Sequence, residues 1–445
     1  MSQKPLADDR FVHGGDLALP RMKLSRWGFL RSPRSVFGRN VLRVLIGTGL
    51  AQSISVASIP VLGWLYLPAE LGVFAAFYSF ASIFSSLAGL RYELAISTVS
   101  DDGEAWDILR LVWCLNLLWA AVCLAGLLVY IPHSLQDLGG FVYALPLMVG
   151  LNAGRSSATY WLARRSCFSA TARMKVLHAS VTVALQIVLA YLVGGGRALV
   201  LAACLGSIAA LVYGAIHSIL SRPDLTEHHP GCVRASWAAI LRRHARFPLY
   251  LLPAHGVNVL SGNLPILFFG SFAGPEFAGM FFIAWRIVQT PVIFLGRSIA
   301  QVFYPEAARQ YNLRGECGAL FGKVVRRLAC MYAVVLPLIG VLAYIGLPVV
   351  LGVEKWTQVG TIALLLSVFS IVEAVDSPVS SIWIITKHQL HDLVWQVGLL
   401  VLVAVGLWSG CAASGPFGAV IGYGAAITLG FGINLVYCRR FSRGR

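Results

Sequence analysis

The sequence predicts an all-α polytopic membrane protein of about twelve transmembrane helices, arranged as two six-helix lobes related by pseudo-two-fold symmetry, with both termini cytoplasmic. Apolar residues make up 58% of the 445 residues and charged residues only 12%, a balance that soluble globular proteins do not reach. Twelve apolar segments approach or exceed the roughly 20 residues that a helix needs to cross a bilayer. A short motif also recurs in the two halves at an offset of 207 residues.

The first six apolar segments form the predicted N-terminal lobe. The first contains Pro60, and the second follows the motif Pro68-x3-Gly72-x-Phe74. A proline within a membrane helix frees a backbone carbonyl and bends the helix. The predicted segments are residues 44–66, 73–90, 108–131, 141–162, 176–193 and 198–220.

The second six segments repeat this order. The first contains Pro265, and the second follows Pro275-x3-Gly279-x-Phe281. The correspondence predicts a duplication, an arrangement in which related halves enclose a central cavity. The predicted segments are residues 247–272, 277–295, 328–350, 359–385, 393–408 and 417–437, of which 393–408 is the shortest.

The whole chain then divides into five parts. Its N-terminal tail interleaves basic and aromatic residues, which fits either a segment lying on the inner leaflet or a disordered tail. In the linker, Glu227, His228, His229 and Cys232 match no familiar metal-ligand spacing, so a polar connection is favoured and no metal or cofactor is expected. The parts are a basic cytoplasmic tail (1–43), the N-terminal lobe (44–220), a cytoplasmic linker (221–246), the C-terminal lobe (247–438) and a basic cytoplasmic tail (439–445).

Basic residues predict the orientation in the membrane. With the N-terminus in the cytoplasm, all but three of the 35 Lys and Arg fall in inner tails, inner loops or inner helix ends; the exceptions are Arg197, Lys355 and Arg286. This distribution satisfies the positive-inside rule. The net charge of +16 therefore reflects topology and requires no nucleic-acid partner. A basic inner face also attracts anionic headgroups, so membrane lipids are expected partners.

The chain lacks the features of an enzyme or an ATP-driven pump. No polar stretch is long enough for a soluble catalytic or nucleotide-binding domain, and we predict no catalytic residues. Gly318-x3-Gly322-Lys323-Val324 is one residue short of a phosphate-binding loop and lacks the Ser or Thr that holds magnesium.

Four arginines are candidates for binding a substrate, because a charge deep in a membrane helix costs at least ~2.5 kcal/mol and normally faces a wet or protein-lined interior. Arg286 and Arg155 lie well inside predicted helices, and Arg91 and Arg297 close the inner ends of two others. A structural ion pair of Arg286 with Glu373 is the alternative for the first. Snorkelling to the interface is the alternative for Arg91 and Arg297.

Polar side chains in other segments extend this set. Glu373 and Asp376 are three residues apart and so share a helix face, which fits either a proton or cation site for ion coupling or a buried pairing. Asn258, Asn263 and Gln52 are able to hydrogen-bond a polar ligand, although packing between helices uses the same residue types. Arginine's planar guanidinium pairs well with phosphate, so the interior favours an anionic substrate with a polar body.

Motifs in both halves resemble those of a known family. Pro60-x-Leu62-x3-Tyr66-x-Pro68-x-Glu70-x-Gly72-x-Phe74 and Leu90-Arg91-Tyr92-Glu93-Leu94-Ala95-Ile96 resemble the start of bacterial polysaccharide flippases of the Wzx type. Gln301-Val302-Phe303-Tyr304-Pro305-Glu306 and Gly352-x-Glu354-Lys355-Trp356 resemble their second half. The likeness runs from about Val44 to the C-terminal end, and the Leu-Arg-Tyr-Glu block is its most specific part.

The resemblance implies the fold of the multidrug, oligosaccharidyl-lipid and polysaccharide exporter superfamily, with an alternating-access cavity between two lobes. It implies a bacterial inner-membrane flippase that moves an oligosaccharide on undecaprenyl pyrophosphate to the outer leaflet for surface polysaccharide (O-antigen, capsule or exopolysaccharide) synthesis. It also implies the use of an ion gradient and cationic residues in the cavity. Arg91 is the one residue of this chain to which the resemblance assigns that role, because it lies within the matching block. A polysaccharide polymerase and a chain-length regulator are candidate partners of a functional monomer.

Two other functions remain open. A drug/cation antiporter of the same superfamily is expected to have an acidic or aromatic cavity, whereas this one is predicted to be basic. A membrane-embedded polysaccharide polymerase or ligase is expected to have a large outer loop with catalytic residues, and the predicted outer loops are short.

Overall fold

The computed structural model describes residues 36–222, 236–352, 354–386 and 388–444 of the chain. All regular secondary structure in these ranges is helical. Most of the predicted N-terminal tail lies outside the described residues, and so does most of the predicted linker with Glu227, His228, His229 and Cys232.

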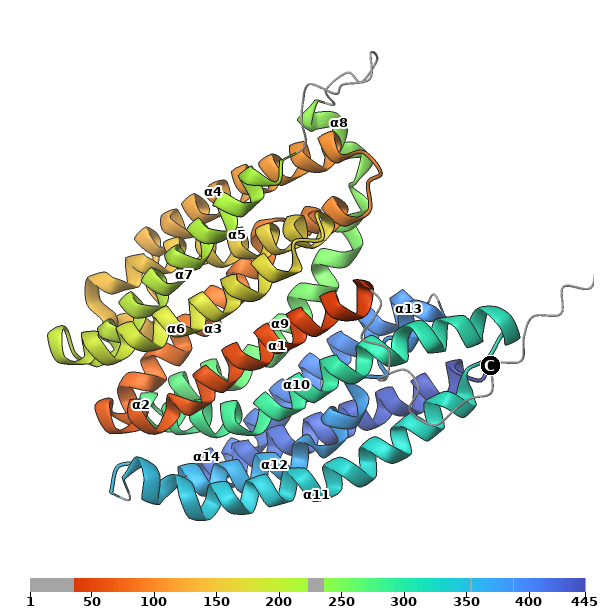
Figure 1. The fold of residues 1–445 in the computed structure, drawn as a ribbon. Helices are drawn as coiled ribbons and strands as arrows, with labels where there is room; N and C mark the ends of the chain where they lie inside the picture. Colours follow the sequence, from red (N-terminus) through yellow and green to blue (C-terminus); the bar gives the residue numbers. More distant parts are fainter. Residues whose placement is uncertain (1–35, 223–235, 353, 387, 445) are drawn as a thin grey trace, which may run out of the picture.

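The first half of the chain forms a bundle of α-helices, with short 3-10 segments at Tyr92–Ser97 and His133–Tyr143. Figure 1 shows α4–α7 packed as one group, with α1 running between this group and α10. The helices are α1 (Val36–Ala57), α2 (Ile59–Leu65), α3 (Pro68–Ala88), α4 (Asp102–Val129), α5 (Ala144–Arg164), α6 (Phe168–Leu192) and α7 (Gly195–Leu220).

The second half forms the other bundle. A short helix that lies beside α4 of the first half, and a π-helical turn, Phe247–Leu251, precede its long helices. Its last four long helices lie together below α1 in Figure 1. The helices are α8 (Trp237–Arg243), α9 (Leu252–Phe272), α10 (Pro275–Arg314), α11 (Gly318–Leu351), α12 (Val359–Asp376), α13 (Ile382–Ile385) and α14 (Gln389–Phe441).

Each of the twelve predicted segments falls on one or two of these helices, which confirms the all-α membrane fold. Within the described ranges, nine helices are long and apolar enough to cross a membrane. Polar residues such as Asn152 and Arg155 in α5 keep that helix below this threshold, and α14 counts once although it contains two of the predicted segments. Twelve crossings and cytoplasmic termini stay predictions.

The last helix is a hairpin of two arms. Ser414 and Gly415 leave the helical conformation, and Gly415 takes a positive φ of 65° that favours glycine. The arms then pack closely, because a Cβ added at Gly410 would overlap the carbonyl oxygen of Gly418. This break separates the predicted segments 393–408 and 417–437.

Several helices differ from the predicted segments in their bounds, and three of these differences are the most informative. The segment 277–295 belongs to a helix that continues to Arg314, and the segment 328–350 belongs to one that begins at Gly318. The added turns are rich in polar and basic residues, so hydropathy falls although the helix persists. The segment 44–66 is interrupted at Ser58, where α1 ends before Pro60, whereas Pro265 lies inside an unbroken α9.

The repeated motif forms a reciprocal contact between the two lobes. A Cβ added at Gly72 of α3 would overlap the carbonyl oxygen of Pro275, and one added at Gly279 of α10 would overlap that of Pro68. Both glycines are therefore required for the two helices to approach this closely. The exchange of equivalent residues is what a pseudo-two-fold axis between α3 and α10 produces.

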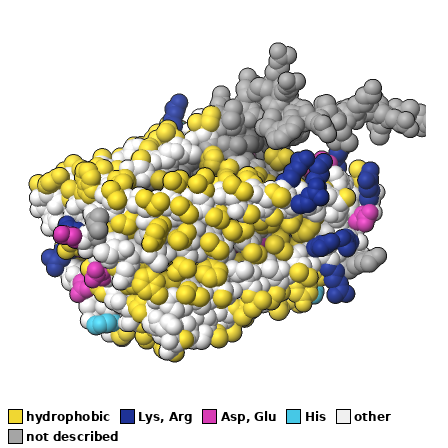
Figure 2. All heavy atoms as spheres, turned by 90° about the horizontal axis from the view of Figure 1, so that it is seen from below, with side chains coloured by type: hydrophobic (Ala, Val, Ile, Leu, Met, Phe, Trp, Pro, Cys, Tyr) yellow, Lys and Arg dark blue, Asp and Glu magenta, His cyan; other side chains and the backbone are white. Residues whose placement is uncertain are grey.

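Further contacts between the lobes lie at the same end of the bundle. The buried indole of Trp356 donates to the carbonyl of Gly63, 3.1 Å away, and the indole of Trp64 donates to the carbonyl of Val350. Figure 2 shows Lys and Arg gathered at the opposite end, with a broad apolar surface between. The lobes are therefore joined at the end that is poor in basic residues.

Candidate functional site

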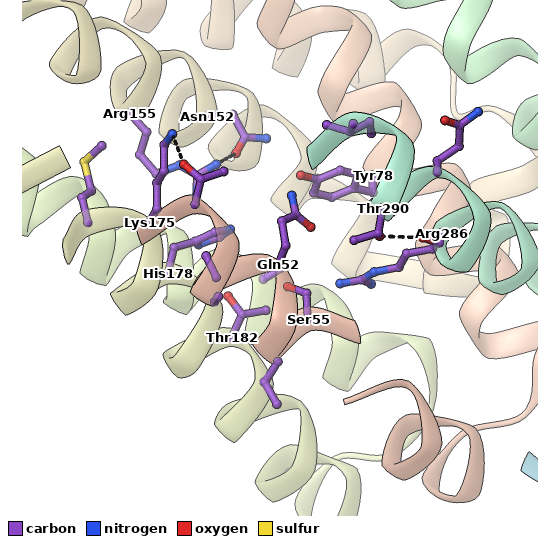
Figure 3. A pocket seen from close by; sticks show the side chains of 18 of the residues that line it. Gln52, Ser55, Tyr78, Asn152, Arg155, Lys175, His178, Thr182, Arg286 and Thr290 are labelled. Carbon is purple, nitrogen blue, oxygen red and sulfur yellow. Dashed lines mark hydrogen bonds between the residues drawn. The ribbon is translucent and has the colours of Figure 1, made fainter. Parts of the chain in front are cut away.

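A cavity of about 520 Å³ lies between the two lobes, on the basic side of their contact. Five helices of the first half line it, α1, α3, α5, α6 and, through Ala203, α7, and α10 closes it from the second half. In Figure 3, Arg155, Lys175 and His178 lie on one side and Arg286 on the other, with Gln52 and Ser55 of α1 between them.

The charge of the cavity is of one sign. Its basic lining residues are Arg155, Lys175, His178, Arg286 and Arg297. Among the residues described as lining it there is no Asp or Glu. Cations without nearby counter-charges favour an anionic ligand, because partly buried charges are costly when unpaired.

Two of these side chains are held by neutral partners. Nη2 of Arg155 donates to Oδ1 of Asn152 at 3.0 Å, and Nζ of Lys175 donates to Oγ1 of Thr48 at 3.0 Å. Neutral partners orient a cation without cancelling its charge. Neither hydrogen bond supplies a counter-charge, so both cations remain available to pair with an anionic ligand.

Arg286 faces the cavity from α10. Its guanidinium carbon lies 5.9 Å from the centre of the Phe282 ring, a distance that allows a cation–π interaction. Within the described part of the chain, no carboxylate is within 4.0 Å of it. The alternative of an ion pair between Arg286 and Glu373 therefore finds no support in the described residues.

Four of the seven predicted substrate-binding residues line the cavity: Gln52, Arg155, Arg286 and Arg297. The other three lie elsewhere. Asn263 donates to the carbonyl of Val259 in its own helix at 2.8 Å, and Asn258 is exposed.

Arg91 is the third predicted residue outside the cavity lining. It follows α3 with a positive φ of 63°, and its Nη1 lies 3.3 Å from Oε1 of Glu93. Burial raises the pKa of the Glu93 carboxyl, and the charge of Arg91 opposes this shift. In this conformation Arg91 is thus paired with Glu93, which belongs to the same Leu-Arg-Tyr-Glu motif.

The two predicted ion-coupling residues each contact an amide. Oε2 of Glu373 accepts from Nε2 of Gln289 at 2.8 Å. Both carboxylate oxygens of Asp376 accept from Nδ2 of Asn434, at 2.9 and 2.8 Å. No Lys, Arg or His lies within 4.0 Å of either carboxylate in the described ranges. Asp376 is buried and Glu373 half-buried, so a bound proton or cation would offset the cost of their unpaired charges.

The sequence pattern of the family described as "polysaccharide biosynthesis protein" matches residues 61–361, more than half of the chain. The chain belongs to this polysaccharide biosynthesis protein family. The family agrees with the resemblance found in the motifs of both halves.

One characterised relative of this family member is the teichuronic acid biosynthesis protein TuaB of Bacillus subtilis (strain 168). The two are 24% identical over 164 residues, which cover 37% of this chain and 34% of TuaB. The chain thus matches about a third of the length of this relative.

Solved structures share the fold of this family member across most of its length. An inward-facing multidrug resistance MATE family transporter of the MOP superfamily has a TM-score of 0.65 at 15% identity, covering 89% of this chain and 94% of its own. An outward-facing one has a TM-score of 0.56 at 15% identity, covering 91% and 95%. A MOP superfamily transporter from Pyrococcus furiosus, described as having a binding pocket of reversed polarity, has a TM-score of 0.59 at 15% identity, covering 91% and 96%. The chain is thus a multi-pass membrane protein of this family, and its fold is shared with these solved structures.

Lys175 and His178 were not predicted for the cavity. The sequence does contain a signal for them, since Lys175, His178, Thr182 and Gln186 recur every three or four residues on α6 and all line the cavity. Lys175 was read as part of the basic inner end of its helix. The polar residues that follow Lys175 on the same face of α6 indicate that this face, with Lys175, lines the cavity.

Proposed function

We propose that this protein flips an undecaprenyl-pyrophosphate-linked oligosaccharide from the inner to the outer leaflet of the bacterial inner membrane, for surface polysaccharide synthesis. The observation that carries the proposal is the cavity lined by five basic side chains and by no described acidic one. Such a cavity suits a cargo that joins phosphate charges to a polar glycan. The lipid tail would stay in the bilayer.

The basic residues occupy two levels of the cavity. Arg286 and Arg297 both lie on α10, and eleven residues of helix separate them by roughly 16 Å along its axis. Arg297 and Lys175 are nearer the basic end, where the pyrophosphate would enter. Arg286 and Arg155 lie deeper and would contact the glycan, or the pyrophosphate later in the cycle.

Arg91 would act at the inner mouth, outside the cavity itself. Its guanidinium contacts Glu93 in this conformation, so a role in capturing pyrophosphate requires that this contact open. Arg91 shares the inner side of the molecule with Arg297, its counterpart at the corresponding helix of the second half. Arg91 and Arg297 would together make the first contact with the pyrophosphate of the cargo.

Ion coupling would use Glu373 and Asp376. Asp376 is buried and Glu373 half-buried in the second lobe, and neither has a basic partner among the described residues. A proton or cation bound there biases the alternating states only if its affinity differs between them. A polymerase and a chain-length regulator would receive the cargo on the outer side from a monomeric transporter.

The drug/cation antiporter is the second candidate function, and it fits the cavity less well. Neither Asp nor Glu lines the described cavity, so a cationic drug would face repulsion from both sides. The relative TuaB, by its description, serves the synthesis of an acidic polymer, which is in keeping with an anionic cargo.

The test is to follow lipid-linked oligosaccharide in cells without the protein. Deletion is expected to leave the cargo on the cytoplasmic leaflet. Arg286→Ala and Arg155→Ala at normal abundance should fail to restore it to the outer leaflet, while Arg314→Ala at the exposed end of α10 should succeed. Normal appearance of cargo outside in the deletion strain would refute the proposal.

A further inference from the structure

Gln289 lines the cavity and also contacts the half-buried carboxyl group of Glu373. It lies on α10 one turn after Arg286 and lines the same cavity, although only 3% of it is exposed. Its Nε2 donates to Oε2 of Glu373 on α12 at 2.8 Å. The side-chain amide of Gln289 thus connects the cavity lining to the Glu373 carboxyl group, which does not itself line the cavity.

Glu373 has few groups that could balance its charge. The titratable groups around it are Asp376, one turn along its own helix, and the phenol of Tyr423 from α14. Tyr332 of α11 packs against the neighbouring residues of α12. None of these is basic, so the Gln289 amide is the group that responds when Glu373 gains or loses a proton.

The Gln289 side chain can respond because one end of its amide donates hydrogen bonds and the other end accepts them. An ionised carboxylate only accepts hydrogen bonds, so it holds the amino end of Gln289 and leaves the carbonyl oxygen for the cavity. A protonated carboxyl has a hydrogen to donate and favours the carbonyl end instead. A turned amide then presents its amino group to the cavity, beside Arg286.

We infer that Gln289 links protonation of Glu373 to anion binding in the cavity, so that the anion binds more tightly when Glu373 is protonated. The inference rests on the proposed function, because it assumes an anionic cargo. A carbonyl oxygen repels an anion and an amino group donates to it, so the two orientations differ in sign at the wall that holds Arg286.

The second acidic group lacks such a link. The Asn434 amide that holds Asp376 is fully buried, and its Oδ1 accepts from the indole of Trp383 at 2.9 Å. Both ends of that amide are engaged, so it resists turning. Neither Asp376 nor Asn434 lines the cavity.

The test measures binding of a singly sulfated disaccharide to the purified full-length transporter in detergent. A sulfate ester keeps its charge between about pH 5.5 and 8. All variants also carry His178→Gln, so that no histidine of the cavity lining contributes to the measured pH dependence. The Kd is expected to be roughly tenfold lower at the acid end, since a hydrogen bond to a charged group is worth about that much. Gln289→Met should bring this ratio to less than about twofold.

The matched control is Gln396→Met. Gln396 also donates to a carboxylate, that of Asp392 at 3.0 Å, but it lies outside the cavity lining. It should keep the tenfold ratio. Glu373→Gln provides a second test that does not depend on the folding of Gln289→Met, and it should also show no pH dependence.

The outcomes separate the two proposals. Absence of binding of the sulfated disaccharide at every pH would overturn the assignment of the cavity to an anionic cargo, and with it the proposed function. Binding that is independent of pH before Gln289 is changed, or a pH ratio that survives in Gln289→Met or Glu373→Gln, would overturn the linkage alone.

Discussion

The indole nitrogen of Trp356 lies 3.1 Å from the backbone carbonyl oxygen of Gly63, and this hydrogen bond joins the second lobe to the first. Trp356 is fully buried, and its acceptor belongs to the last turn of α2. The bond lies at the end of the molecule opposite the basic residues. The bond therefore holds the two lobes together at this end.

Trp356→Phe is therefore expected to favour separation of the lobes at this end. Loss of the hydrogen bond should cost about 0.5–1.5 kcal/mol, which raises the open population roughly two- to twelvefold. Distances between spin labels on α2 and α11 would report it. Trp395→Phe is the matched control, because that indole donates to Gly430 within one lobe; an equal shift in both variants would contradict the prediction.

Gly72→Ala should destabilise the contact between α3 and α10. The added methyl group would overlap the carbonyl oxygen of Pro275, and relief of such overpacking typically costs about 1–3 kcal/mol. We expect a lower melting temperature or a shift to the state with this end open. Gly262→Ala has open space around the new methyl group and should behave like the unchanged protein.

Arg297→Gln should weaken capture of the cargo more than its passage. Because Arg297 lies toward the basic end, its loss removes a charge-assisted hydrogen bond at entry and should raise the half-saturating cargo concentration about tenfold. Flipping of a lipid-linked oligosaccharide in reconstituted vesicles would measure this. A fall in maximal rate at unchanged half-saturation would place Arg297 in a later step.

Glu93 should make stability depend on pH. Burial raises the pKa of this carboxyl above its ordinary value of 4.5, so the folded chain holds the proton more tightly than the unfolded chain. The stabilising contribution is complete below the ordinary value and is lost as the pH rises through the raised one. Glu93→Gln should flatten this part of the melting curve against pH, and Glu354→Gln, at an exposed site, should leave it unchanged.

Two residues of the cavity lining could be predicted from the sequence, because a charged side chain deep in an apolar helix is costly in contact with lipid. Arg155 and Arg286 were predicted inside the protein because their depth in a helix leaves lipid as the alternative, and both line the cavity. Lys175 sits where a basic residue also satisfies topology, so its position was ambiguous.

The partners of these residues were harder to predict. Gln289 and Glu373 are 84 residues apart, and their contact depends on how α10 packs against α12. Hydropathy and helical period describe one helix at a time and carry no information about which faces of two helices meet. Arg91 was placed at the mouth for the same reason, since the turn that brings it to Glu93 lies outside any periodic pattern.

The glycine contact between α3 and α10 also bears on how easily the lobes separate. It joins backbone to backbone, so parting it exposes no charge and frees no side chain that had to be ordered first. What is lost is close contact between atoms, each pair worth only ~0.1–0.2 kcal/mol. Such a contact keeps the two lobes in register, and it can break and re-form at a small cost in free energy.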